Sequence, residues 1–364
     1  MKLIKFHSEE IHQKDFAKEL RANVNAYFKD NNLSPKGNYV MVIKTISVYA
    51  LYVLPILAIY YFQLSFLWTL LMFILAGIGT AGVGMSVMHD SLHNSYSKHK
   101  WVNTVMGWSM YIIGSNVFNW KIQHNIFHHA YTNIDGLDED IQTRWIMRFS
   151  EQTPLKPIHK YQYLYSLPLY TMMTFSMLLG DLPQLIGYYE TGLMEKHLGK
   201  PKFEFSLMIG VKLVYLFVLI GLPIIFTPLL WWQVLLAFTA MHMVAGFIFS
   251  LIFQMAHIVE GVVQPTADEN NVTDNEWMVH QLMTTANFAP RNHLLNWYVG
   301  GLNFQVEHHL FPNVCHIHYP KIAKIVEATA NKYGVPYLQN DTLWKAIVSH
   351  LKRLKELGRP MVNA

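Results

Sequence analysis

The sequence predicts an all-α integral membrane protein, with four transmembrane helices in two hairpins and a helical cap on the cytosolic side. Three observations predict this fold. Of the 364 residues, 52% are hydrophobic and only 14% are charged, which is too apolar for an ordinary soluble domain. Four apolar stretches are long enough to cross a bilayer, since about 20 residues cover a hydrocarbon core of about 30 Å. Short turns without Lys or Arg join these stretches in pairs.

The four stretches are Met41 to Phe62, Phe66 to Val87, Ser206 to Phe226 and Leu229 to Phe253. QLS joins the first pair and TP joins the second, so each pair is expected to form a helical hairpin with its turn on one side of the membrane. The segments outside the pairs hold nearly all of the Lys and Arg, which places both chain ends and the central segment in the cytoplasm.

These spans divide the chain into five predicted parts, which are a cytosolic arm (1–40), a first hairpin (41–87), a cytosolic cap (88–205), a second hairpin (206–253) and a cytosolic C-terminal region (254–364). Two more apolar runs, Trp101 to Phe118 and Tyr163 to Gly180, contain Gly, Ser, Pro or Tyr and are expected to be interfacial helices. We expect the bacterial inner membrane rather than the endoplasmic reticulum.

Composition also limits the partners. The single cysteine, Cys315, excludes a disulfide framework within the chain. A net charge of +4, without a long basic run, gives no reason to expect a nucleic-acid partner, whereas membrane lipid is an expected one.

The 19 histidines are unusual in so apolar a chain, and many of them fall in three clusters. In MHDSLHN, His89 and His93 are four residues apart, so on a helix both rings can reach one metal ion. QHNIFHHAYTN repeats this spacing with His124 and His128, and His129 is expected about 100° further round the helix. This arrangement predicts a metal on each of two adjacent faces.

The third cluster is QVEHH, in which Gln305, His308 and His309 share one helical face and Glu307 points to the other side. One such pair is weak support for a metal site, because HxxxH occurs by chance in histidine-rich helices. Three clusters that are all predicted on the cytoplasmic side strongly favour one. The sequence leaves open whether Gln305 binds metal through its oxygen, holds a water or hydrogen-bonds a neighbouring imidazole.

HDSLH, HNIFHH and FQVEHHLFP, in this order and with these spans, resemble the membrane fatty-acid desaturases. The Gln of the third motif and its flanking LNF and LFP resemble the front-end branch, of delta-5 and delta-6 type. The resemblance implies a non-haem centre of two iron ions on the cytosolic side. Such a centre uses O2 and two electrons to introduce a double bond into a fatty acyl chain. The chain carries no HPGG motif of a fused cytochrome b5 domain.

The resemblance also implies a ligand set. The family has an isolated histidine ligand after the last span, which is His257 in QMAHIVE, although Ala256 stands where relatives often have Asn. The implied ligands are eight histidines, with Gln305 at the place of a ninth: His89, His93, His124, His128, His129, His257, His308 and His309. Asp90, Asp138 and Asp140 are candidates to orient the ligating rings through their second N–H.

Other polar residues have structural interpretations. His242 lies within the fourth span, too far along the helix from His257 to share its metal, and is expected to make an interhelical hydrogen bond. Glu307 is expected to pair with a basic residue. His280 and His293 flank a polar loop and are expected at the surface.

Several alternatives stay open. The same scaffold serves acyl-chain hydroxylases, acetylenases and sphingolipid desaturases. A non-enzymatic haem or metal protein of the membrane is a more distant alternative, because bis-histidine haem needs ligands inside the spans and only His242 lies in one. The acyl substrate can be linked to CoA, acyl carrier protein or lipid. A separate ferredoxin, or cytochrome b5 with its reductase, is the expected electron donor.

Overall fold

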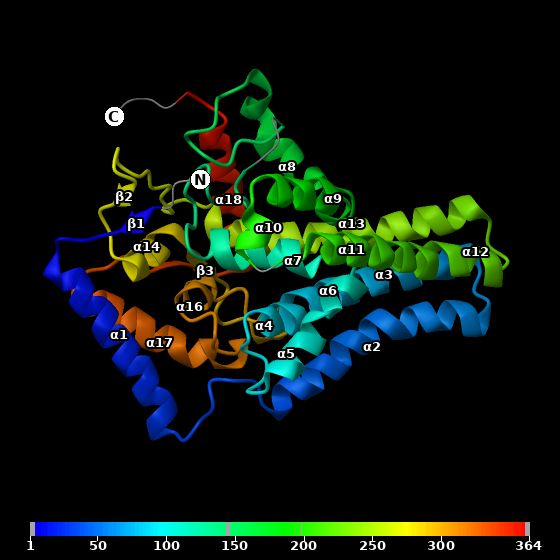
Figure 1. Cartoon of the computed structure of the whole chain (residues 1–364), viewed down its shortest axis with the longest axis horizontal. Coiled ribbons are helices and arrows are strands. Elements are labelled where there is room, and N and C mark those ends of the chain that lie inside the picture. Colours follow the sequence, from blue (N-terminus) through cyan, green and yellow to red (C-terminus); the bar gives the residue numbers. More distant parts are fainter. Residues whose placement is uncertain (1–3, 143–145, 198, 361–364) are drawn as a thin grey trace. The chain divides into compact units, whose positions relative to one another are not determined.

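A computed structural model describes residues 4–142, 146–197 and 199–360 (Figure 1). Its residues form two compact units, each built from segments that are distant in the sequence. The membrane unit comprises Asn38–Ile122 and Leu167–Leu251, and the histidine unit comprises Met1–Gly37, Gln123–Ser166 and Ile252–Ala364. Most of the expected cytosolic range 88–205 therefore groups with the membrane unit, and only its middle part belongs to the histidine unit.

Four helices among the described residues are long and apolar enough to cross a membrane: Tyr39–Phe62, Phe66–Leu92, Pro201–Phe226 and Trp231–His257. They confirm the four predicted spans, and the short links after Phe62 and Phe226 confirm the two helical hairpins. Large apolar side chains such as Leu57 and Leu213 are exposed on these helices, as expected for side chains that face lipid.

The first span is helix α2 (Tyr39–Phe62), and the second combines α3 (Phe66–Gly82), the π-helical turn η1 (Val83–Met88) and α4 (His89–Leu92). The third combines α11 (Pro201–Leu216), the π-helical turn η4 (Phe217–Gly221) and α12 (Leu222–Phe226), and the fourth is α13 (Trp231–His257).

Two glycines let α3 pack tightly against its neighbours in the membrane unit. A Cβ atom at Gly77 would collide with the backbone of Met241 in α13, and one at Gly79 with the backbone of Tyr52 in α2. Small residues allow such close approach where lipid-exposed helices lack a hydrophobic driving force. Helices α2 and α3 accordingly run side by side (Figure 1).

Shorter helices cover the two ambiguous apolar runs, and neither run is among the four candidate spans. The first contains α5 (Lys100–Gly107), α6 (Ser109–Ile112) and α7 (Val117–Trp120), and it is interrupted at Gly114, which has a φ of +90°. The second overlaps α8 (Gln162–Tyr170) and α9 (Met173–Glu190), which are followed by α10 (Leu193–Lys196).

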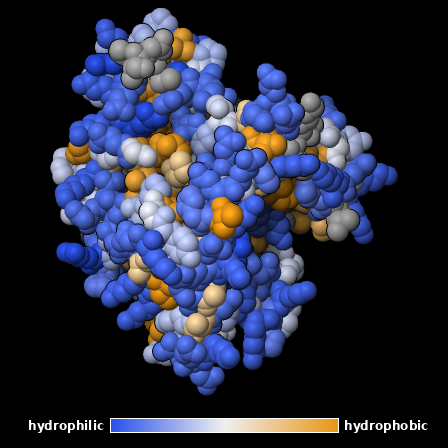
Figure 2. Space-filling model, turned by 90° about the vertical axis from the view of Figure 1, so that its left-hand side faces the viewer, coloured by the Kyte–Doolittle hydropathy of each residue, from blue (hydrophilic) through white to orange (hydrophobic). Residues whose placement is uncertain are grey.

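The histidine unit is a small helical domain with its own core. Its helices are α1 (Ile11–Asp30), α14 (Trp277–Thr284), α15 (His293–Tyr298), α16 (Gln305–Leu310), α17 (Tyr319–Tyr333) and α18 (Leu343–Leu357), with 3-10 turns η3 (Pro157–Tyr161) and η5 (His316–His318). Helices α1 and α17 lie side by side (Figure 1). Figure 2 turns the side on which they lie toward the viewer, and hydrophilic residues predominate on that face.

Two short parallel sheets in the histidine unit add strands to the helices that the sequence predicted. Strand β1 (Lys5–Phe6) pairs with β2 (Val272–Thr273), and β3 (Ala286–Phe288) pairs with β4 (Leu338–Asn340). Each pairing joins segments more than fifty residues apart, so local periodicity does not indicate it.

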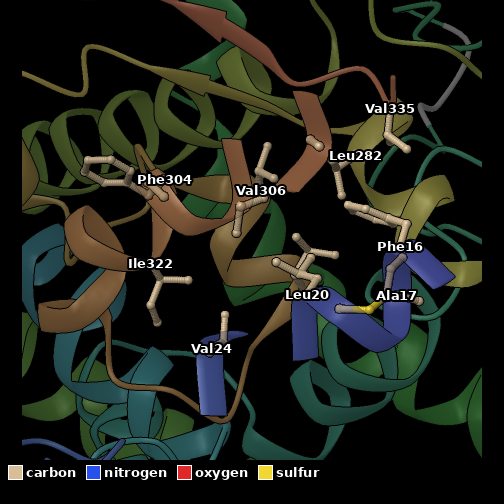
Figure 3. Packing of buried hydrophobic residues seen from close by; sticks show 14 of the residues in the cluster. Phe16, Ala17, Leu20, Val24, Leu282, Phe304, Val306, Ile322 and Val335 are labelled. Atoms are coloured by element: carbon tan, nitrogen blue, oxygen red, sulfur yellow. The ribbon is translucent and has the colours of Figure 1, made fainter. Parts of the chain in front are cut away.

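The apolar core of the histidine unit holds α16 in place (Figure 3). Phe16 and Leu20 of α1 lie in one cluster with Leu282 of α14, Ile322 of α17 and Val306 of α16, all fully buried. Helix α1, which lies within the predicted N-terminal arm, is thus part of this core. Burying each such side chain contributes roughly 1.5–3 kcal/mol before the entropy cost of ordering it.

Candidate metal centre

A π-helical turn shapes the second histidine cluster. Turn η2 (Lys121–His128) continues to a backbone hydrogen bond from the His129 N–H to the His124 oxygen, five residues back and 3.0 Å long. The Nε2 atoms of His124 and His129 therefore lie 3.1 Å apart. From the sequence, His129 was expected about 100° further round an α-helix, and this contact with His124 was not anticipated, because the α-helical spacing of four residues was assumed.

Three histidines from distant parts of the chain converge in the histidine unit: His128 of η2, His257 at the end of α13 and His309 of α16. One ring nitrogen of each lies within 4.8 Å of the others. Their ring centroids are 4.7 to 4.9 Å apart. The Nε2 atom of each is buried and has no hydrogen-bond partner among the described residues. Buried polar atoms are almost always paired, so three unpaired nitrogens that lie close together are compatible with metal binding.

The opposite nitrogen of each of these rings is held in place. The Nδ1–H of His128 donates to both carboxylate oxygens of Asp138 at 3.1 Å, and that of His309 donates to Oε1 of Gln281 at 2.9 Å. His257 donates to the backbone oxygen of Thr284 at 3.4 Å. Such contacts leave the proton on Nδ1 and the lone pair on Nε2, which is the tautomer that a metal requires.

A second group of ligand nitrogens adjoins the first. His129, His308 and His309 each offer one nitrogen, and these atoms lie within 4.8 Å of one another. The rings of His129 and His308 are 4.5 Å apart, and His124 stacks on His308 at 6.0 Å. Because His309 belongs to both groups, the unit presents two adjoining nitrogen clusters. This arrangement suits two neighbouring ions better than one.

Carboxylates lie behind these rings. Asp138 is fully buried and also accepts the Asn133 N–H at 2.8 Å. Asp140 accepts a hydrogen bond from Gln123 and lies 3.6 Å from His128 Nδ1. Of the three acids that the sequence proposed to orient rings, these two contact imidazoles of the histidine unit.

Burial and charge set the protonation of the group. Burial lowers the pKa of His128, but the charge and hydrogen bond of Asp138, with Asp140 behind it, outweigh this effect and raise that pKa overall. Burial raises the pKa of Asp140 to about 6, against the attraction of His128. For His309, burial and the neighbouring imidazoles lower the pKa well below its usual value. His309 is therefore a neutral ring with a free lone pair, as a metal ligand must be.

The third cluster forms the short helix α16. Its Val306 and Leu310 enter the apolar core, while the two histidines lie in the nitrogen clusters. Gln305 is buried at the first position of the helix. Glu307 is also fully buried, and burial raises its pKa to about 7 against hydrogen bonds from Asn287 and Tyr337. The expectation of a basic partner for Glu307 was wrong, because an amide and a phenol hold it.

The first histidine cluster belongs to the membrane unit. The rings of His89 and His93 are 4.7 Å apart, and the edge of Trp120 lies 5.8 and 5.5 Å from them. His89 begins α4 directly after the π-turn η1, and His93 ends that helix. Asp90 lies 4.0 Å from His89 Nδ1, and its backbone oxygen accepts hydrogen bonds from the backbone N–H groups of Ser95 and Tyr96.

Some residues that lie at the site were not identified from the sequence. His280 was expected at the surface but is fully buried in α14, where it donates to the Thr132 backbone oxygen at 3.0 Å. Its neighbour Gln281 holds His309 and also accepts from the Thr132 hydroxyl. The adjacent polar residues His280 and Gln281, in an amphipathic stretch after His257, could have indicated a role near the site. His293 is exposed, as expected.

Asn133 also escaped notice, although it joins three segments of the site. It has a φ of +59°, and its amide donates to the backbone oxygens of His257 at 2.9 Å and Thr284 at 3.2 Å. Asn tolerates this left-handed conformation better than most residues do.

His242 in the membrane unit has both ring nitrogens satisfied. Nε2 lies 2.9 Å from the Tyr215 hydroxyl and Nδ1 lies 3.0 Å from the Thr174 hydroxyl. These contacts join α13 to α11 and α9 and confirm the predicted interhelical hydrogen bond.

Comparisons with known proteins identify the family of the chain. Residues 40–340 match the family model described as fatty acid desaturase. The chain is 33% identical to an sn-1 linoleoyl-lipid 6-desaturase of Arthrospira platensis, over 94% of this chain and 92% of that protein. It is 33% identical to an acyl-lipid (8-3)-desaturase of Physcomitrium patens, over 94% and 72%. It is 27% identical to the Delta(5) fatty acid desaturase A of Dictyostelium discoideum, over 97% and 77%.

The matched range contains all three histidine clusters, His257 and the four candidate spans except the first residue of α2. The relatives cover nearly the whole chain, and they act on acyl groups by name. The chain therefore belongs to the fatty acid desaturase family, and it is a membrane oxidoreductase that desaturates fatty acyl chains.

Proposed function

We propose that the protein is a front-end acyl-lipid desaturase with a non-haem centre of two iron ions. The observation that carries the iron site is the pair of adjoining nitrogen clusters in the histidine unit, together with the unpaired Nε2 atoms of His128, His257 and His309. Imidazole suits iron, zinc and copper alike, so the choice of iron rests on the family.

The overall reaction balances with O2 as the oxidant. Two neighbouring CH2 groups of the acyl chain lose two hydrogens, and O2 with two electrons and two protons leaves as two waters. Bound iron would activate O2 for this removal of hydrogen. No acid–base pair is needed, because the reacting carbons carry no acidic proton.

The residues of the chain bind and orient. Asp138, Gln281 and the Thr284 carbonyl fix the three Nδ1 atoms, so the rings present Nε2 without further reorganisation. The ligating rings are all at least nine-tenths buried, so bulk water has little access to the place where the metal would be held.

The proposed ligand set extends beyond these rings. His129 and His308 form the second nitrogen cluster with His309, and His124 adjoins it, with its Nε2 3.1 Å from that of His129. For His89, His93 and Gln305 the support is the motif pattern of the family, and so it is for Asp90 as a residue that orients a ring. Removing His93 or Gln305 and measuring bound iron tests this extension directly.

The proposed substrate is an acyl chain carried on a membrane lipid. This follows the names of the relatives, which describe linoleoyl-lipid and acyl-lipid substrates. CoA and acyl carrier protein are the rival carriers. We further propose that the histidine unit and both chain ends lie in the cytoplasm, at the inner membrane of a bacterium, and that a separate ferredoxin, or cytochrome b5 with its reductase, delivers the electrons.

The test is expression in a host of known lipid content with a working electron donor, followed by mass spectrometry that locates any new double bond. We expect a new double bond in lipid-linked chains and two iron ions per purified chain. A hydroxylated product, heavier than the alkene by one oxygen and two hydrogens, would move the protein to the hydroxylases. A protein with iron and donor but no new unsaturation would contradict the proposal.

A further inference from the structure

Glu307 is a buried carboxylate without a cationic partner among the described residues that contact it. Oε2 accepts from the Asn287 amide at 2.8 Å and Oε1 accepts from the Tyr337 hydroxyl at 2.9 Å. Its exposed fraction is 0%. Burying an acid is costly unless its hydrogen bonds are worth the loss of water. An apolar residue would fill this place at lower cost, so the two directed contacts need an explanation.

Asn287 holds α16 at a second point. Its Oδ1 accepts the backbone N–H of Val306 at 2.9 Å, one of the first N–H groups of the helix, which have no partner within it. The same side chain thus ties both the backbone of the first turn and the carboxylate of the next residue. The amide of Asn287 also lies 2.8 Å from the Tyr337 hydroxyl. The three polar side chains therefore contact one another in pairs.

Both donors are supplied by one small sheet. Asn287 lies in β3 and Tyr337 directly precedes β4, and these two strands pair in parallel with Asn287 opposite Gln339. The sheet brings together segments that are otherwise fifty residues apart. It provides a fixed base against which α16 is held.

Helix α16 needs such a hold, because its six residues are too few to be stable alone. Val306 points into the apolar core beside Leu282, but apolar contacts are not directional, so polar contacts are needed to define the rotation of the helix (Figure 3). Glu307 is followed directly by His308 and His309. A rotation of the helix about its axis would move both ring nitrogens away from their clusters.

We propose that Glu307, Asn287 and Tyr337 form a clamp that sets the rotation of α16 and thereby positions His308 and His309 at the metal centre. The three are positioning residues rather than ligands. The inference rests on the proposed function in one respect, which is that these two histidines bind metal. In the proposed function, the face of α16 that carries the histidines binds metal. The clamp gives the face that carries Glu307 a role as well.

An exchange of the amide and the carboxylate tests the clamp. Glu307→Gln places two amides opposite each other, and Asn287→Asp places two carboxylates opposite each other, so each single variant loses the matched pair. The double variant Glu307→Gln/Asn287→Asp restores one amide facing one carboxylate, and the carboxylate introduced in β3 can still accept the Val306 N–H. Tyr337→Phe removes a single hydroxyl and is the mildest change. Glu269→Gln is the control, because Glu269 is an exposed acid of the histidine unit in the loop before β2.

The full-length protein in detergent is stripped of metal and titrated with Co²⁺ alone, whose visible absorption reports ligand geometry. Each single variant should bind Co²⁺ about 10- to 100-fold more weakly and show an altered spectrum, as for other residues that orient ligands. The double variant should regain most of the affinity and the wild-type spectrum, and Glu269→Gln should not differ from wild type.

A purely structural role predicts a different outcome. In that case the single variants would melt at lower temperature but keep the wild-type Co²⁺ affinity and spectrum, and this result would overturn the clamp. If Glu307→Gln fails to fold, Tyr337→Phe and the double variant still give the comparison. Failure of the wild-type protein to bind Co²⁺ at all would instead contradict the proposed metal centre, so the two failures are distinguishable.

Discussion

His242 in the membrane unit and His309 in the histidine unit are equally hidden from solvent, yet their surroundings differ in one respect. Both ring nitrogens of His242 are used, by Tyr215 and Thr174. His309 has one nitrogen fixed by Gln281 and the other buried without a hydrogen-bond partner among the described residues. A fully satisfied buried imidazole stabilises helix packing. A buried imidazole with only one hydrogen-bonded nitrogen is suited to bind a ligand through the other, because a buried unpaired nitrogen costs free energy.

The largest expected effect is that of removing one of the histidines with an unpaired Nε2 atom. His128→Ala should abolish desaturation and lower the metal content, because it removes one of three converging Nε2 atoms. Membrane insertion should be unchanged. Product analysis, metal analysis of purified protein and membrane fractionation check these outcomes. Unchanged metal and activity would remove the second histidine cluster from the site.

The next largest effect is expected for Asp138, which holds the Nδ1 atom of the His128 ring. Asp138→Asn keeps the volume but removes the charge that accepts the His128 Nδ1–H. We expect metal affinity or activity to fall about 10- to 100-fold. Asp135→Asn, a change of an exposed acid in the same loop, is the control and should leave both unchanged. Equal behaviour of the two variants would show that Asp138 does not orient the ring.

His242 should behave in the opposite way. His242→Leu leaves the hydroxyls of Tyr215 and Thr174 without this partner, which costs about 1–3 kcal/mol of stability. Thermal unfolding in detergent should show a lower midpoint. Metal content and turnover per bound metal should match wild type. A loss of metal in this variant would break the distinction between the two kinds of histidine.

The smallest effect is expected for Gln305→His. If the side chain lies at the metal, an imidazole can take its place and activity should be retained. Gln305→Leu, which removes both polar atoms, should lower activity and is the comparison. Loss of activity in Gln305→His with normal folding would assign Gln305 to hydrogen bonding of a neighbouring ring instead.

Length and hydropathy were sufficient to predict the membrane part. A span needs about 20 apolar residues wherever it occurs, so the four helices could be found without knowing their neighbours. Spacing likewise brought out His128 and His309 as candidates, because three clusters rarely occur by chance. His257 stands alone, and it needed the family resemblance.

Long-range contacts account for what the sequence did not reveal. The partners of Glu307 lie 20 and 30 residues away, and Gln281 lies 28 residues from His309, so no local pattern connects them. The pairing of β3 with β4 is of the same kind. The contact between His124 and His129 escaped prediction for a local reason, since composition does not indicate where a helix adopts the wider π-turn.

That π-turn has a consequence for protein engineering. The sequence motif QHNIFHH does not by itself determine the geometry of the second cluster. On a regular α-helix, His124 would share a face with His128 and not with His129. A transplanted motif would need the wider turn as well as the histidines. Deleting one residue between His124 and His128 would restore the α-helical pitch and leave His129 four positions after His124, so these two rings would still share a face. The backbone conformation of this segment is therefore as important to the proposed metal centre as its side chains.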